Sequence, residues 1–218
     1  MARAPLLALA ALLVAGCAAP LDGIDPGSTP RAVGDLLVSE AVTLTTPEGP
    51  GFEPGIAVAP DGALYAAAAK TQRPHSGGRL ADWLWHSQDG GATWNDVPAP
   101  DAFRLMPGLE GDVAVDGEGR LYYLDIWGPD LSVSRWSPGP TWDWSRPVAG
   151  TPAPLDDRPF AAAHGDGRVY LLSNQAVEGQ RIVVSRSLDG GVTWTQAFAF
   201  PGSLFCRIDA SPADDKTV

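Results

Sequence analysis

The stretch that decides the fold is "SLDGGVTW", residues 187–194, in which an Asp and two Gly precede a Thr-Trp pair. The same pattern occurs earlier as "SQDGGATW", residues 87–94, which is identical at six of the eight positions. Between them lies a degenerate copy, "RWSPGPTW", residues 135–142, in which Ser137 stands at the position of the Asp. The copies begin 48 and 52 residues apart. A period near 50 residues, made of short strands, indicates the blades of a β-propeller.

A second pattern has the same period. The segments "EPGIAVAPDGALYAA" from Glu53, "EGDVAVDGEGRLYYL" from Glu110 and "RPFAAAHGDGRVYLL" from Arg158 align without gaps. Each reads as an apolar strand, a turn with Gly and a second strand, and "RIDASPADDKTV" from Arg207 predicts the opening of a fourth copy. The 25 Gly, 21 Pro and eight Trp agree with many turns and packed aromatic rings. We therefore expect an all-β chain of about three four-stranded blades and the start of a fourth, hence an incomplete propeller.

The pattern Ser-x-Asp-x-Gly-x-Thr-Trp resembles the Asp-box, the mark of sialidase-like propellers with bacterial neuraminidase repeats. Together with the second pattern, the resemblance covers residues 51–218. Because Gly tolerates positive φ and an Asp side chain accepts backbone N–H groups, we expect Asp89 and Asp189 to fix turns, and the motif Trp side chains to pack between blades. The motif residues to which we assign a structural role are Ser87, Asp89, Gly91, Thr93, Trp94, Gly139, Thr141, Trp142, Ser187, Asp189, Gly191, Thr193 and Trp194.

The N-terminus reads as a secretion signal. "MARAPLLALAALLVAGC" has a positive start at Arg3, an apolar run and small residues before Cys17. Residues 14–17 resemble the lipobox of bacterial lipoproteins, which implies a signal peptide over residues 1–16, a lipid on Cys17 and a location at the bacterial cell envelope. The alternative is an ordinary secretory signal with a chance Cys. Residues 17–50 then form a flexible tether and a lead-in strand, and residues 51–218 form the blades.

Charge and residue spacing exclude several classes of partner. The chain has 26 acidic and 15 basic residues, a net charge of −11, which opposes binding to nucleic acid. The three His have no metal-ligand spacing, and the acidic run from Asp112 to Glu118 lacks the order of an EF-hand loop. We therefore predict no metal site and no cofactor.

Candidate ligand contacts lie at the strand ends opposite the motif turns, because propellers usually bind around the central channel on one face. Residues that lead into the inner strands should converge there, and Trp127 in "DIWGPDLS" is expected on a loop, where it could stack on a sugar ring or pack against a neighbouring loop. Solvated rim charges are the alternative reading of the charged positions. The candidates are Glu53, Glu110, Asp112, Trp127, Asp157, Arg158 and Arg207.

The resemblance to sialidases implies three Arg for the substrate carboxylate, a Tyr nucleophile with a Glu, and an Asp acid/base. The first Arg belongs to a Phe/Tyr-Arg-Ile-Pro motif, but the corresponding "FEPG", residues 52–55, has Glu53 in its place. No complete catalytic set is visible. We expect a surface-tethered module that binds a glycan or a protein, with a neutral or cationic ligand. The alternative is a glycoside hydrolase with a non-standard site, such as a Glu53 and Glu110 pair.

Overall fold

The computed structural model describes residues 31–33, 36–38, 42, 44, 51–70, 82–97, 111–127, 130–137, 139, 141–148, 156–175, 181–202 and 207–210. The chain forms two compact units, residues 1–44 and 45–218. In the first unit, β1 (Arg31–Val33) and β2 (Leu36–Val38) pair as an antiparallel hairpin within the predicted tether. The predicted signal peptide and Cys17 lie outside the described residues. Over the described part of the chain, no helix has the length and apolar character needed to cross a membrane.

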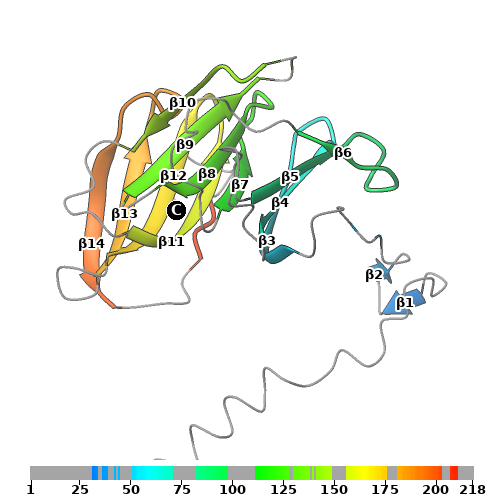
Figure 1. Cartoon of the computed structure of the whole chain (residues 1–218), viewed down its shortest axis with the longest axis horizontal. Coiled ribbons are helices and arrows are strands. Elements are labelled where there is room, and N and C mark those ends of the chain that lie inside the picture. The colour runs from blue at the N-terminus through cyan, green and yellow to red at the C-terminus, as the bar shows by residue number, and fades with distance from the viewer. Residues whose placement is uncertain are drawn as a thin grey trace, which may run out of the picture. The chain divides into compact units, whose positions relative to one another are not determined.

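The second unit consists of three four-stranded antiparallel sheets, shown in Figure 1 in cyan, green and yellow to orange. The first blade contains β3 (Gly51–Val58), β4 (Leu64–Lys70), β5 (Asp82–Ser87) and β6 (Asn95–Asp96). The second contains β7 (Gly111–Val115), β8 (Leu121–Trp127), β9 (Asp130–Trp136) and β10 (Trp144–Pro147). The third contains β11 (Asp156–His164), β12 (Arg168–Gln175), β13 (Arg181–Ser187) and β14 (Thr195–Pro201). The prediction of an all-β fold of propeller blades is confirmed.

Alternation along the strands places apolar side chains on both faces of the middle blade. In β8, Leu121 and Tyr123 belong to the core shared with the first blade, whereas Tyr122 and Leu124 belong to the core shared with the third. This follows from the two-residue period of a strand, which sends successive side chains to opposite faces. The core between the first and second blades contains Ala59, Ala63, Tyr65, Ala67, Leu84, Val113, Leu121 and Tyr123. The core between the second and third contains Tyr122, Leu124, Ile126, Leu131, Val133, Val148, Val169 and Leu171.

Buried aspartates stand at both ends of the inner strand of the middle blade. Asp112 near the start of β7 accepts a hydrogen bond from the backbone N–H of Ala161 in β11 at 3.0 Å. Asp116, directly after β7, accepts one from the backbone N–H of Gly167 in the third blade at 3.2 Å. Because both carboxylates are almost fully buried, these bonds tie the second blade to the third at two levels.

The inner strands on either side of β7 each contain a bulge. The register of β3 against β4 shifts between Phe52 and Gly55, and that of β11 against β12 shifts between Asp157 and Phe160. Each bulge includes a Pro, Pro54 in β3 and Pro159 in β11, which has no N–H to donate to a sheet and is tolerated where the ladder is interrupted. The bulges therefore interrupt the first and third inner strands at equivalent positions.

Residues 207–210, the predicted opening of a fourth copy, pack on the far face of the third blade. Ala210 is buried with Ala162 and Tyr170, and Ile208 contacts two neighbouring clusters of that face. The segment is not assigned as a strand. It nevertheless brings Arg207 close to the inner strands, which positions the candidate site.

Candidate functional site

The motif turns at residues 87–94 and 187–194 have the same hydrogen bonds. In the first, both oxygens of Asp89 are engaged, because Oδ1 accepts from the backbone N–H of Thr93 at 2.8 Å and Oδ2 from its hydroxyl at 2.6 Å. The Ser87 hydroxyl donates to Asp89 at 2.9 Å and accepts from the N–H of Gly91. The indole N–H of Trp94 donates to the carbonyl of Gly91 at 2.9 Å. Residues 187–194 repeat each of these contacts within 0.1 Å.

The hydrogen bonds of these turns lower the pKa of their aspartates. The pKa of Asp89 falls to about 2, first because of the Thr93 hydroxyl and then because of the Thr93 N–H and the Ser87 hydroxyl. Slight burial opposes the shift at Asp189, but the bonds from Thr193 and Ser187 outweigh it, and its pKa is lowered too. A carboxylate that is held ionised by short local bonds is poorly suited to proton transfer at neutral pH.

The degenerate copy at residues 135–142 uses a different aspartate. Asp143, one residue beyond the motif, accepts hydrogen bonds from the Ser137 hydroxyl at 2.7 Å and from Nε of Arg135 at 2.9 Å. The indole N–H of Trp136 donates to the carbonyl of Gly139, the position that accepts from the motif Trp in the other two turns. Asp143 and Trp136 can both be read in the sequence, but neither stands at one of the positions that define the motif. In this copy, Asp143, which lies outside the motif, therefore takes the place of the missing motif Asp.

The motif turns lie on one face with the first hairpin turn of the blade, since the N–H of Gly190 donates to the carbonyl of Gly167 at 2.8 Å. The side chains of the three motif Trp residues are partly buried. Trp142 and Trp194 contact the edges of the two cores between blades.

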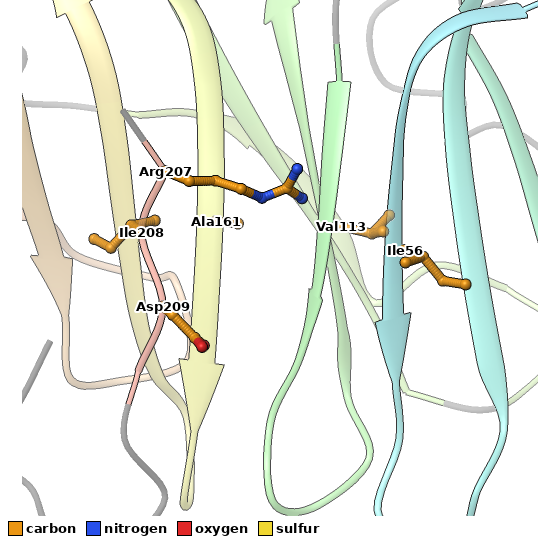
Figure 2. Close-up of a pocket in the computed structure, with 6 residues that line it drawn as sticks. All are labelled: Ile56, Val113, Ala161, Arg207, Ile208 and Asp209. Carbon is orange, nitrogen blue, oxygen red and sulfur yellow. The ribbon is translucent and has the colours of Figure 1, made fainter. Parts of the chain in front are cut away.

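Along the inner strands, the structure contains a pocket of about 320 Å³. It is lined by Ile56, Val113 and Ala161, which occupy equivalent positions in β3, β7 and β11, and by Arg207, Ile208 and Asp209. We call it the inner-strand pocket. In Figure 2 the side chain of Arg207 extends from residues 207–210 toward β7, which carries Val113.

Asp112 lies beside this pocket and is 3% exposed. A Cβ atom on Gly55 would come within 2.2 Å of its Oδ1, so the absent side chain of Gly55 makes room for the carboxylate. Burial raises the pKa of Asp112, although hydrogen bonds from the Ala161 and Val113 backbone and the charge of Arg207 oppose the shift. The sequence predicted a ligand contact at Asp112, whereas the structure shows a buried group that contacts three other segments.

Arg207 contributes the guanidinium of the pocket. Its side chain is 62% exposed, and one Nη lies 3.7 Å from Oδ1 of Asp112. The guanidinium also stands 5.3 Å from the centre of the Phe160 ring, a cation–π distance. The pocket therefore combines apolar side chains with a cation whose charge is partly compensated from within the protein.

The structure describes less of the remaining predicted ligand contacts. Glu53 is exposed and lies in the β3 bulge with a φ of 51°, the one positive φ outside glycine among the described residues. Trp127, expected on a loop, is instead the last residue of β8, where it pairs with Asp130, and its side chain is not described. Asp157 and Arg158 are described as β11 backbone alone, and Glu110 lies outside the described residues.

Metal-ligating side chains do not gather within the described ranges. No group of three or more His, Cys, Asp or Glu could hold a metal ion there. His86 stacks on Tyr65 with ring centres 4.7 Å apart, and burial lowers its pKa. His164 stacks in the same way on Tyr170. Both imidazoles thus act as packing groups between strands.

Comparisons with solved structures support the fold. A protein of unknown function from Dyadobacter fermentans matches with a TM-score of 0.53 and 19% identity, over 84% of this chain and 61% of that one. An α-L-arabinanase from Penicillium chrysogenum matches with a TM-score of 0.51 and 18% identity, over 68% and 49%. An ulvan lyase of polysaccharide lyase family PL25 matches with a TM-score of 0.50 and 12% identity, over 78% and 49%.

These matches show a fold that carbohydrate-active enzymes share, at identities too low to transfer an activity. Sialidases also match, with TM-scores of 0.42 to 0.48, on which we base no argument. This chain spans between about half and three fifths of the length of the three proteins described above. No model of a known family matches it, and neither does any curated protein.

Proposed function

We propose that the chain is a carbohydrate-binding propeller module whose ligand occupies the inner-strand pocket. One observation carries the proposal: equivalent positions of three inner strands, Ile56, Val113 and Ala161, line a single pocket together with Arg207 and Asp209. An apolar lining suits the C–H face of a sugar ring, and the guanidinium and carboxylate can bond its hydroxyl groups. The fold shared with an arabinanase and an ulvan lyase supports a glycan as the ligand class.

The first test is binding of the full chain to a glycan panel that includes arabinobiose, the ligand in the arabinanase complex. Ile56 and Val58 provide a matched pair, because both are apolar β3 residues, exposed by 60% and 63%, and Ile56 alone lines the pocket. We expect Ile56→Ala to weaken binding several-fold and Val58→Ala to leave it unchanged. Equal losses in both variants, or no binding to any glycan, would overturn the proposal.

A second candidate is a glycoside hydrolase with a non-standard site, and the environment of Asp112 favours it. A general acid of a glycosidase needs a raised pKa, which burial gives to Asp112. It must also contact the substrate, which for a carboxyl group that is 3% exposed would require the wall of the pocket to open around it. The pair first considered, Glu53 and Glu110, has one member outside the described residues. Release of a chromophore from a panel of aryl glycosides, abolished in Asp112→Asn, would establish the hydrolase. Glycan binding without turnover would support the binding module.

The proposed location is the bacterial cell envelope, with export by residues 1–16 and a lipid on Cys17. The sequence around Cys17 supports it, because small residues and an apolar run precede the Cys. We expect Cys17→Ser to move the protein from the membrane fraction to the soluble fraction. Mass spectrometry that finds an unmodified N-terminus further along the chain would exclude the lipid.

A further inference from the structure

Asp112, in the protein interior, forms an ion pair with Arg207, which lines the pocket. Asp112 is 3% exposed and fixed by the N–H of Ala161, whereas the Arg207 side chain is 62% exposed and lines the pocket. Their nearest atoms, Oδ1 and Nη, are 3.7 Å apart. The anion is therefore hidden from a ligand, while the cation is presented to it.

A few other groups can influence this pair. The strand β3 contributes the backbone of Gly55 and, further along, the exposed carboxylate of Glu53. The neighbouring β8 contributes the buried Asp125, which pairs with Gly111 in the sheet. Residues 207–210 contribute the exposed Asp209, whose Oδ1 accepts from the N–H of Ala210. From β11 comes the Ala161 N–H, while the side chains of Asp157 and Arg158 are not described.

The protonation state of Asp112 sets the net charge near the pocket. An ionised carboxylate at 3.7 Å offsets part of the field of the guanidinium in a partly desolvated site. A protonated Asp112 keeps a carbonyl oxygen that can accept from Ala161, but it no longer offsets the positive charge. Because burial raises the pKa of Asp112, its neutral form is reached under milder acid than for an exposed Asp.

We propose that Asp112 is a positioning residue that sets how much positive charge Arg207 presents to the inner-strand pocket. Glycans that carry a carboxylate then bind better once Asp112 is neutral, whereas neutral glycans are little affected. This inference rests on the proposed function, because it requires a glycan in the pocket. To that function it adds a residue, Asp112, that controls the selection between neutral and acidic glycans.

The binding test uses the tightest-binding glycan of the panel, in a neutral form and with one hydroxymethyl carbon oxidised to a carboxylate. In the full chain, the affinity of the acidic form relative to the neutral form should rise about tenfold as the pH falls through the raised pKa of Asp112, as expected for one charge-assisted hydrogen bond. Asp112→Asn should show the higher ratio at pH values above and below this pKa. Arg207→Ala should lose the rise.

Asp209→Asn is the matched control, because it also removes one negative charge at the pocket but leaves the buried carboxylate in place. This variant should retain the dependence on pH. A ratio that does not change with pH in the unaltered chain, or that responds to Asp209→Asn as strongly as to Asp112→Asn, would overturn the inference and leave glycan binding intact. A panel without any binder would overturn the proposed function as well.

A second readout needs no ligand. The pKa of Asp112, followed by ¹³C NMR of its carboxyl group, should rise further in Arg207→Ala, because Arg207 stabilises the ionised form. Arg207→Lys should restore much of the original value, since it retains the positive charge. An Asp112 pKa that is the same in the unaltered chain and in Arg207→Ala would show that the two groups are uncoupled and would end the proposal.

Discussion

Two pairs of aspartates in this protein contrast in how they are held. Asp89 and Asp189 are exposed and accept hydrogen bonds from residues at most four positions away. Asp112 lies near the start of β7 and Asp116 directly follows this strand. Both are buried, and they accept hydrogen bonds from residues 49 and 51 positions away. The first pair stabilises a turn within one blade, whereas each member of the second pair also accepts a hydrogen bond that forms only when the second and third blades pack together. Aspartates of the first kind are therefore components of the repeat, and those of the second kind are particular to the middle blade.

The members of the buried pair also differ from each other. Asp116 accepts from five donors, which are the N–H groups of Glu118, Arg120 and Gly167, Nε of Arg120 and the hydroxyl of Tyr122. Asp112 has fewer such partners, and its pKa is raised by burial. Asp116 therefore ties its own turn to the third blade, whereas the raised pKa of Asp112 is the property on which the proposal above depends.

The largest effect that would sharpen this contrast is expected from Asp116→Ala. The substitution removes the acceptor of five hydrogen bonds, including the one from the third blade, and leaves the Tyr122 hydroxyl without this acceptor, so the free energy of unfolding should fall by about 3–5 kcal/mol. Denaturant unfolding of the full chain measures it. Glu118→Ala, at the exposed tip of the same turn, is the control and should change stability by less than about 0.5 kcal/mol. Similar losses in both variants would contradict the role given to Asp116.

The next largest effect is expected from Gly55→Ala, which tests the fit between the first two blades. The new Cβ would overlap Oδ1 of Asp112, and such overpacking should cost about 1–3 kcal/mol. The measurement is a double-mutant cycle with Asp112→Ala, which removes the oxygen. The cost of Gly55→Ala should largely disappear in the Asp112→Ala background. Additive losses would mean that the two positions do not touch.

The contrast can also be tested by pH. The pKa of Asp89 should be about 2 by NMR, and Thr93→Val should raise it by removing the hydroxyl donor. A group whose pKa is lowered by folding stabilises the folded state at pH values above its pKa in the unfolded chain. This stability is lost as the pH falls through its pKa in the folded chain. Asp112 should behave in the opposite sense, since its raised pKa makes the folded state less stable as pH rises through the shifted range. Equal pKa values for Asp89 and Asp112 would remove the distinction.

The smallest effect is expected from Asp143→Asn in the degenerate turn. Asp143 accepts from Ser137 and Arg135 while partly exposed, so loss of its charge should lower stability by about 0.2–1 kcal/mol. Slight burial acts against its lowered pKa, and the bonds from Ser137 and Arg135 outweigh it. Denaturant unfolding with Glu118→Gln, which changes an exposed carboxylate in the same way, provides the comparison. No loss of stability would show that Asp143 does not replace the missing motif Asp.

The repeat and its turns could be predicted from the sequence because their contacts are local. The motif at residues 87–94 and 187–194 closes hydrogen bonds within eight residues, and consecutive glycines such as Gly190 and Gly191 allow the two left-handed φ angles of 71° and 83°. The period between copies then indicated four-stranded blades. In the degenerate copy this reasoning missed Asp143, because that residue lies one position beyond the pattern although its carboxylate accepts a hydrogen bond from Ser137.

Tertiary structure decided what the candidate residues do. The sequence placed Asp112 and Arg207 among possible ligand contacts, since both stand near the beginning of an inner segment of the repeat. It could not indicate that Gly55, 57 residues before Asp112, makes room for the carboxylate, or that Arg207 reaches it from 95 residues away. Burial and charge coupling depend on which segments meet in space, and strand pairing with its two-residue period does not specify that. The sequence by itself therefore determined the blades and their turns, while the packing of three inner strands and residues 207–210 decided the pocket and the state of its buried carboxylate.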